Sequence, residues 1–427
     1  MQKIHRLNFV FVVFSLFLLS ACVSSGTSPW NAQPTSASTT PEALDTKVSE
    51  TTLPAPTETA EETQISFTGL PPVKVGILLP LTGPQAPMGQ SMLQAAQLAL
   101  FDMGYENFEL MPRDTQGTPQ GALQATSSAI NDGAQLLLGP LLADNVRAAK
   151  GVASRRNINL IAFSTDWSLA GNNTYVMGFL PFAQVQRVTR YAAANGIRRM
   201  GVIAPADKYG DTVTKAFQQN AQANAIAIVK DQRFNPSERN LAPQLAEFAQ
   251  SAPVNAAPNA PQPVPFEGVF LPIGGSQAQL VASALSYYGL TPDKVRRLGT
   301  GLMDNEALAR ETNLNGAWFA APSPRQRRGF EKRYEDTFGA KPLRLASLAY
   351  DATALAAVLA ASGYQTTGRP AFDRRSLTNP NGFAGIDGIF RFGRNGLVER
   401  GLAILEIRNG RIVEADPAPT TFQTLGY

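Results

Sequence analysis

From residue 73 onward, short apolar runs alternate with amphipathic stretches of helical period. Short runs rich in β-branched residues and ended by Pro or Gly are typical of buried parallel strands. The pattern predicts strands at residues 73–80, 108–112, 134–138 and 159–163, and helices at about 90–103 and 118–132, with one more helix before the last strand. Strands separated by helices of about 10 to 15 residues indicate right-handed βαβ units and a parallel sheet.

The same rhythm starts again at residue 200. It predicts strands at residues 200–204, 225–229, 268–272 and 297–300, with a helix at about 209–224. The Pro- and Ala-rich residues 252–265 fit neither a helix nor a central strand, so we expect a surface insertion. Asn-Gly pairs within residues 388–413 indicate tight turns and antiparallel strands. We therefore predict an α/β fold with two Rossmann-like, doubly wound lobes, in which ligands bind at the carboxyl ends of the strands.

The N-terminus has the pattern of an export signal. Lys3, His5 and Arg6 precede an apolar run of 11 residues, 9–19, which is too short for a permanent membrane span. The run ends in Leu19-Ser20-Ala21-Cys22, which resembles a bacterial lipobox; an ordinary signal peptide with a chance cysteine is the alternative. We therefore expect a signal peptide at residues 1–21 and lipidation at Cys22. By analogy, Val23 after the cysteine favours the outer membrane, with the domain facing the periplasm of a bacterial cell envelope.

Residues 22–72 are predicted to form a tether. They are rich in Ser, Thr, Pro, Ala and Glu and have almost no periodic apolar positions, so we expect disorder. The total charge of the chain is +4; the signal contributes +2 and the tether −5, which leaves +7 for residues 73–427. The basic residues of that part are scattered and lack interleaved aromatic residues, so we expect no nucleic-acid partner.

Composition excludes several chemistries. His5 and Cys22 are the only histidine and cysteine of the chain, and both lie at the extreme N-terminus. A Cys/His metal site, a Cys nucleophile, a His general base and an internal disulfide are thus excluded from the predicted domain. We expect no cofactor, no metal and no enzymatic activity.

The order of the motifs resembles the leucine-binding protein family of type I periplasmic solute-binding proteins. The resemblance covers residues 73–416 and rests on Leu81-Thr82-Gly83 with Gly89, on Asn131 to Pro140, on Asp207-Lys208-Tyr209-Gly210, and on the turn from Phe390 to Gly396. It implies two lobes joined by three crossovers that close on a ligand. The expected boundaries are about 73–182 and 322–395 for lobe 1, 183–321 and 396–416 for lobe 2, and 417–427 for a C-terminal tail.

The resemblance also implies site residues in lobe 1. Amino-acid-binding members hold the ligand carboxylate with a Ser hydroxyl, and the matching position here is Ala143, which has none. The next loop, Ser164, Thr165 and Asp166, matches a loop that supplies N–H groups and a Thr hydroxyl. Asp166 lies near the Thr position, where an ionised carboxylate repels the ligand carboxylate. The alternative interpretation is that Ser164 and Asp166 cap the following helix.

In lobe 2, Tyr209 matches an aromatic residue that covers the ligand, although it could equally pack on the lobe. Gly274 lies in a loop that matches the remaining wall of the site. Asp304, or Glu306, matches an acid that takes the ligand ammonium; helix capping is the alternative for Asp304. A hydrogen-bonding grip for an α-amino acid is therefore incomplete in this sequence.

Two functions remain open. The first is a solute-binding protein that delivers a small polar ligand, an amino acid or a related compound, to an ABC-type permease. The second is an interaction protein, because a lipid-anchored chain with a long polar tether and such a domain also resembles the penicillin-binding-protein activators of bacteria. In that case the partner is a cell-wall synthase. Tyr209 and the family pattern favour the first function, whereas the long tether, Val23 and Ala143 favour the second.

Overall fold

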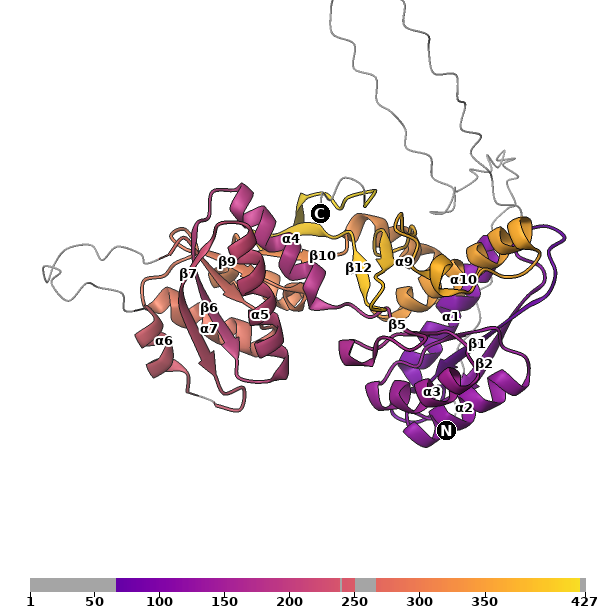
Figure 1. Cartoon of the computed structure of the whole chain (residues 1–427). Helices are drawn as coiled ribbons and strands as arrows, with labels where there is room; N and C mark the ends of the chain where they lie inside the picture. The colour runs from indigo at the N-terminus through magenta and orange to yellow at the C-terminus, as the bar shows by residue number, and fades with distance from the viewer. Residues whose placement is uncertain (1–66, 239, 250–265, 423–427) are drawn as a thin grey trace, which may run out of the picture. The chain divides into compact units, whose positions relative to one another are not determined.

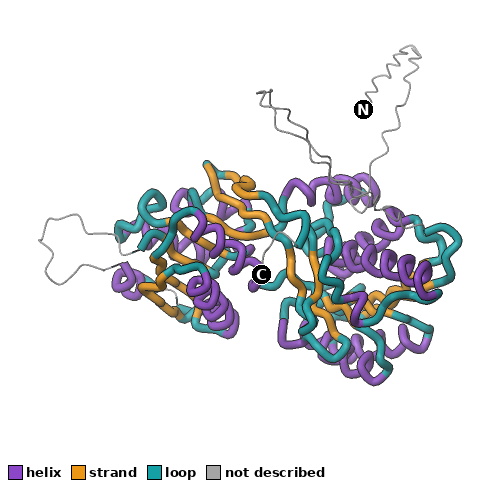
Figure 2. Tube along the Cα trace, turned by 45° about the horizontal axis from the view of Figure 1, so that its top comes forward, coloured by secondary structure: helices purple, strands orange, loops and turns teal. Residues whose placement is uncertain are grey.

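The computed structural model of the chain describes residues 67–238, 240–249 and 266–422. The predicted signal peptide with Cys22, the predicted tether up to residue 66 and the predicted insertion at 252–265 lie outside the described residues. The described chain forms two sheets of parallel character with helices on both faces, as Figures 1 and 2 show. The predicted α/β fold with two doubly wound lobes is confirmed.

Lobe 1 is built on a parallel sheet in the strand order β2-β1-β3-β4-β5. Its strands are β1 (Val73–Leu79), β2 (Phe108–Asp114), β3 (Leu136–Leu138), β4 (Leu160–Ala162) and β5 (Thr174–Val176). β1 pairs with both β2 and β3, and only Lys74 along it is not buried. Burial on both faces explains why this strand reads as a continuous apolar run.

The helices of lobe 1 are α1 (Ala86–Met103), α2 (Pro119–Asn131), α3 (Ala143–Arg155), α9 (Pro324–Phe338) and α10 (Ala346–Thr367). α1 packs along α10, and α2 packs along α3. Every residue of α10 from Ala346 to Ala357 is buried. Among the described helices, α10 is the one long and apolar enough to cross a membrane, but 89% of its apolar window is buried inside the protein, as expected of a core helix.

Lobe 2 is built on a larger sheet in the order β14-β13-β10-β9-β8-β6-β7. Its strands are β6 (Arg199–Pro205), β7 (Ala227–Phe234), β8 (Gly268–Leu271), β9 (Arg296–Gly299), β10 (Trp318–Ala321), β13 (Ala403–Arg408) and β14 (Arg411–Asp416). One apolar cluster under α6 (Ala242–Ala249) and α7 (Gly275–Tyr287) and another under α4 (Pro181–Ala194) and α5 (Lys208–Ala223) cover its two faces. Both faces of the sheet are thereby buried.

The C-terminal strands are antiparallel, as the Asn-Gly pairs predict. β13 and β14 pair across Asn409-Gly410, whose φ angles are 52° and 79°. β11 (Phe390–Phe392) and β12 (Val398–Arg400) form a separate hairpin, which joins lobe 1 through the bridge between Val176 and Leu397. The lobe boundary expected at residues 395/396 therefore falls inside this hairpin, and the chain passes to lobe 2 at residues 400–403.

Within the described chain, the connections between the lobes are residues 176–181, 321–324 and 400–403. The helix expected at 90–103 begins earlier, at Ala86, with Pro87 in its first turn. Proline is well tolerated there, because that N–H group has no partner within the helix. The apolar pattern did not single out α4, α9 or α10, and α10 lacks amphipathic period because it is buried all round.

Residues 67–72, which the sequence assigns to the tether, contact lobe 1. The Phe67 and Tyr105 rings are 6.0 Å apart. The Tyr105 hydroxyl donates to the carbonyl of Pro71 at 2.9 Å, and the side-chain amide of Asn107 donates to the carbonyl of Leu70 at 2.6 Å. The packed part of the chain thus begins several residues before Val73, at the amino-terminal edge of the sheet.

Candidate functional site

The predicted lobe 1 residues follow β3 and β4, at the carboxyl edge of the sheet. Ala143 is the first residue of α3, and the Ncap residue before it makes no side-chain capping bond. Ser164 is buried, and its Oγ accepts a hydrogen bond from the backbone N–H of Asp166 at 3.1 Å. Thr165 is exposed. Ser164 therefore shapes the loop, whereas Thr165 has a hydroxyl open to solvent.

Asp166 caps the short helix η1 (Trp167–Leu169). Its Oδ1 accepts from the Ser168 N–H at 3.1 Å and from the Ser168 hydroxyl at 2.6 Å. Arg147 of α3 lies 3.7 Å from its other oxygen. The hydrogen bonds from Ser168, and more weakly the charges of Lys208 and Arg147, hold the pKa of Asp166 below its usual value. The capping interpretation of Asp166 is confirmed, and the carboxylate is ionised near neutral pH.

The loop after β4 also touches lobe 2. The Trp167 ring packs edge-on against Phe182 of α4, with centroids 5.4 Å apart. The Nζ atom of Lys208, the first residue of α5, lies 5.9 Å from the centroid of the Trp167 ring. This cation–π contact brings the candidate loops of the two lobes together.

Tyr209 is the second residue of α5 and follows β6. Its hydroxyl is 3.1 Å from the Oγ1 of Thr300, which follows β9, and the ring packs partly against the core of lobe 2. Burial raises the pKa of Tyr209, so the phenol stays neutral. Tyr209 thus lies at the carboxyl edge of the lobe 2 sheet, and it also satisfies the packing interpretation.

Gly274 is the Ncap residue of α7 and has an extended backbone. A Cβ atom added to it would lie 2.7 Å from the carbonyl oxygen of Leu302, and Leu302 is itself 49% exposed. Gly274 is therefore required for close backbone packing between the loops after β8 and β9.

Asp304 follows helix η2 (Gly301–Met303) and lies next to a cation of the protein itself. Nη1 of Arg327, in α9, is 3.8 Å from its Oδ2, and both side chains are largely buried. Burial raises the pKa of Asp304, whereas the charges of Arg327 and Arg344 oppose that rise. A ligand ammonium would have to share this carboxylate with Arg327. The alternative acid, Glu306, is exposed in the first turn of α8 (Glu306–Ala309).

A buried cluster of charged residues lies at the connections between the lobes and was missed in the sequence. Asp351 of α10 and Asp387 are fully buried, and Arg400 of β12 is nearly so. Arg344 pairs with Asp387 at 3.3 Å, and its guanidinium stacks on Phe179 at 4.4 Å. A single Asp within an Ala-rich apolar helix is the signal that could have indicated this cluster.

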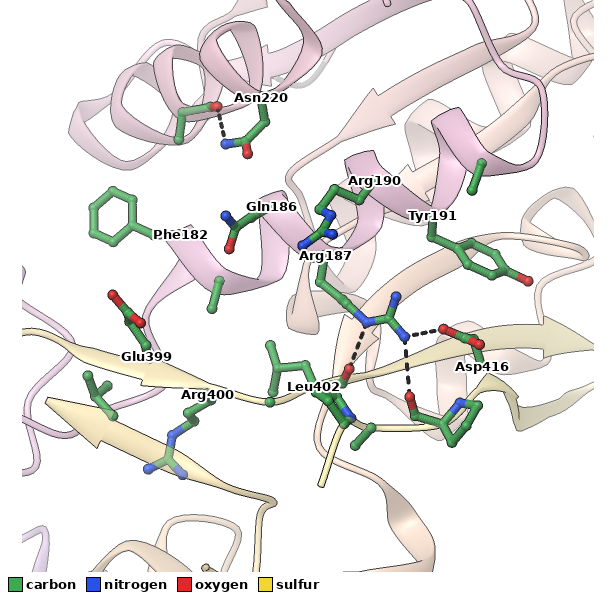
Figure 3. Close-up of a pocket in the computed structure, with 18 of the residues that line it drawn as sticks. Phe182, Gln186, Arg187, Arg190, Tyr191, Asn220, Glu399, Arg400, Leu402 and Asp416 are labelled. Carbon is green, nitrogen blue, oxygen red and sulfur yellow. Dashed lines mark hydrogen bonds and ion pairs between the residues drawn. The ribbon is translucent and has the colours of Figure 1, made fainter. Parts of the chain in front are cut away.

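A groove of about 1100 Å³, the α4 groove, lies elsewhere (Figure 3). It is lined by α4, by the carboxyl-terminal half of α5, by residues 395–402 and by residues 416–420. None of the predicted ligand residues lines it. Arg187 spans it, and its guanidinium donates to the carbonyls of Leu402 and Pro417 at 3.0 and 3.2 Å and pairs with Asp416. The α4 groove and the strand-end residues are separate places.

Two curated relatives have informative names. The Leu/Ile/Val-binding protein BraC3 of Rhizobium johnstonii is 22% identical over 180 residues, 40% of this chain and 49% of that protein. The penicillin-binding protein activator LpoA of Serratia proteamaculans is 27% identical over 169 residues, 39% of this chain and 24% of that protein. The matched part of the chain spans between 24% and 57% of the length of these curated relatives.

Solved structures share the fold. An ABC transporter substrate-binding protein from Sphaerobacter thermophilus has a TM-score of 0.61 at 19% identity and covers 81% of this chain and 97% of that one. The leucine-binding protein LivK from Thermotoga maritima has a TM-score of 0.54 at 19% identity and covers 81% and 99%. At such identities the likeness shows the fold alone.

The assignment to a family rests on most of the chain. The candidate residues of both lobes follow parallel strands, at the carboxyl ends of the two sheets. The family model of periplasmic binding proteins matches residues 72–411, which span both lobes. The chain therefore belongs to the periplasmic binding protein family, of type I.

Proposed function

We propose that the chain binds a small polar ligand, an amino acid or a related compound, between its lobes and delivers it to an ABC-type permease. The observation that carries this proposal is the position of the candidate residues. Ser164 to Asp166 follow a strand of lobe 1, whereas Tyr209, Gly274 and Asp304 follow strands of lobe 2. A ligand that contacts both edges gains binding energy from both lobes only when they are closed. It therefore favours the closed arrangement.

The side chains at these positions narrow the chemical class of the proposed ligand. Ala143 offers no hydroxyl to a carboxylate, and the loop after β4 carries Asp166, which is an ionised acid. Arg327 already neutralises Asp304, the candidate partner of an ammonium group. A free α-amino acid would therefore lose one partner for each of its charged groups, so we favour a related polar compound whose recognition relies on Tyr209, Thr165 and backbone groups.

The second candidate is an activator of a peptidoglycan synthase that acts by protein–protein contact. It is favoured by the similarity to the activator LpoA, by the missing hydroxyl at Ala143 and by the pairing of Asp304 with Arg327. Both proposals include a lipid anchor at Cys22 and a domain that faces the periplasm, with the outer membrane favoured. Neither proposal includes catalysis.

A thermal-shift screen of the full-length protein in detergent, with amino acids, short peptides and cell-wall fragments, tests the first proposal. A ligand at 100 times its dissociation constant adds about 2.7 kcal/mol of stability. Tyr209→Ala should then weaken binding by about 1 kcal/mol or more, the size of an aromatic contact. Tyr287→Ala is the matched control, because Tyr287 lies on α7 and is 83% exposed.

The outcomes separate the two proposals. A shift that Tyr209→Ala reduces and Tyr287→Ala preserves supports ligand binding at the strand ends. A shift that both variants preserve would remove Tyr209 from the site. The opposite outcome has two parts: no compound shifts the melting temperature, and adding the chain raises the reaction rate of a purified peptidoglycan synthase. Together these results would overturn solute binding and support the activator.

A further inference from the structure

The segment after β14 begins on lobe 2 and is held there by α4. Asp416 is the last residue of β14, the edge strand of the lobe 2 sheet. Arg187 of α4 pairs with its carboxylate and donates to the next carbonyl, that of Pro417, at 3.2 Å. The same guanidinium donates to Leu402 in the third connection at 3.0 Å. Arg187 thus ties the start of the segment to that connection, as Figure 3 shows.

The middle of the segment packs directly on the third connection. A Cβ atom added to Gly401 would lie 3.0 Å from Cγ and 3.1 Å from the carbonyl oxygen of Pro419. Such an approach leaves no room for a side chain at position 401. The segment and the connection therefore run in close contact between the lobes.

The end of the segment is inserted into lobe 1. Phe422 is 4% exposed, and the guanidinium carbon of Arg391, in β11, lies 4.4 Å from the centre of its ring. A Cβ atom added to Gly382 would meet Cε2 of Phe422 at 2.6 Å. Arg391 is itself held by Glu399 of β12 at 2.7 Å. The Phe422 ring is therefore buried against the β11–β12 hairpin, between Arg391 and Gly382.

We propose that residues 417–422 are a strap that joins the two lobes beside the three connections and restrains their relative motion. The sequence assigned these residues to a C-terminal tail, whereas both ends of the segment are anchored, one on each lobe. A rotation of the lobes must move Asp416 relative to the hairpin that holds Phe422. The strap must then either stretch or release its aromatic anchor.

The α4 groove supports this assignment. Its walls come from both lobes, with Gln186 and Asn220 from helices of lobe 2 and Asn395 and Glu399 from the hairpin of lobe 1. Residues 416–420 of the strap form a further wall. Since the hairpin and the helices belong to different lobes, the groove must change shape when the lobes move, and the strap limits that change.

Distance measurements between spin labels test the strap in the full-length protein. The labels replace the exposed residues Gln124 on α2 and Lys215 on α5, with Cys22→Ser to avoid a third label. Phe422→Ala should raise the population of a second inter-lobe distance about tenfold, from the few per cent or less usual for a minor conformer. Phe422→Leu, which keeps an apolar side chain, should give an intermediate population.

Two controls separate a restraint from a general loss of stability. Thr420→Ala changes an exposed residue of the same segment. Phe248→Ala removes a buried ring, 3% exposed, from the core of lobe 2. Both should leave the distances unchanged, although Phe248→Ala lowers the melting temperature. The proposal is overturned if Phe422→Ala and Phe422→Leu lower the melting temperature and leave the distance distribution equal to that of Phe248→Ala.

Discussion

Asp351 is the residue whose replacement tests the buried charges most directly. It is fully buried in α10, its Oδ1 accepts from the Ile386 N–H at 2.8 Å, and its Oδ2 has no hydrogen-bond partner. Two charged side chains act on it, Asp387 in the loop before β11 and Arg400 of β12 at 4.0 Å, and Asp387 in turn pairs with Arg344. Burial, and next the charge of Asp387, raise the pKa of Asp351 to about 8.

The sign of the resulting pH dependence follows from linkage. The folded pKa lies above the unfolded value of 3.8, so folding takes up a proton. The stabilisation is fully present below the unfolded pKa and is lost as the pH rises through about 8. A pKa difference of about four units at about 1.4 kcal/mol each gives a limit of about 6 kcal/mol. Between pH 5 and pH 8 the expected loss is about 4 kcal/mol.

Asp351→Asn should remove the loss of stability that accompanies the rise in pH. Asn keeps the acceptor for Ile386 and resembles the protonated acid, so the variant should gain stability over the native chain as the pH rises. Urea unfolding at half-unit steps from pH 5 to pH 8 measures the difference between the two proteins, in which other titrating groups cancel. A difference that stays constant over this range would refute the reasoning, because the proton on Asp351 would then contribute nothing.

Asp387→Asn is the matched comparison, since the same change is made to the other buried carboxylate. Asp387 accepts from the Ser347 hydroxyl at 2.5 Å and pairs with Arg344 at 3.3 Å. Between pH 7 and pH 8 its replacement should destabilise the protein by about 1 to 3 kcal/mol, because the Ser347 hydroxyl and Arg344, which is 36% exposed, lose a charged partner. The two substitutions therefore have opposite expected signs at pH 8.

Two further predictions concern the strand ends. Gly274→Ala should lower the free energy of unfolding by urea by about 1 to 3 kcal/mol, because its Cβ would lie 2.7 Å from the Leu302 carbonyl oxygen. Gly151→Ala, within α3, should be neutral or stabilising, because its Cβ would make only an ordinary contact of 3.8 Å with the flexible Arg155 side chain. Equal effects would contradict the close packing at Gly274. Arg327→Gln should lower the free energy of unfolding by about 1 to 3 kcal/mol at pH 7, because Asp304 loses its cation. The effect should be smaller at pH 5, where Asp304 can take up a proton. A decrease that does not depend on pH would exclude the ion pair as its cause.

Local patterns in the sequence were sufficient to predict most of the strands. The run at β1 is buried except at Lys74, and the Asn409-Gly410 pair forms the expected turn. The helix α10 was missed for a physical reason. It is buried on all sides, so its apolar residues have no helical period against which a polar face could be recognised.

The predicted site residues were harder to interpret than the fold. Asp166 could be assigned to capping because its partner, Ser168, is two residues away. The partners of Asp304, Tyr209 and Asp351 are far along the chain, at Arg327, Thr300 and Arg400. No spacing rule predicts such pairs, because the fold alone brings the two residues together.

The long-range pair of Asp304 and Arg327, which weakens the expected amino-acid grip, also connects the lobes. Asp304 follows a strand of lobe 2, whereas Arg327 lies in α9, whose Tyr334 hydroxyl is 3.1 Å from that of Ser91 in α1 of lobe 1. A carboxylate that holds a cation of the other lobe cannot hold a ligand ammonium at full strength. Such internal contacts, and the anchor at Phe422, hold the lobes to each other without any ligand. If these contacts must break when the lobes rotate, a weakly held ligand supplies too little binding energy to drive the motion, which favours the interaction protein over the transporter component.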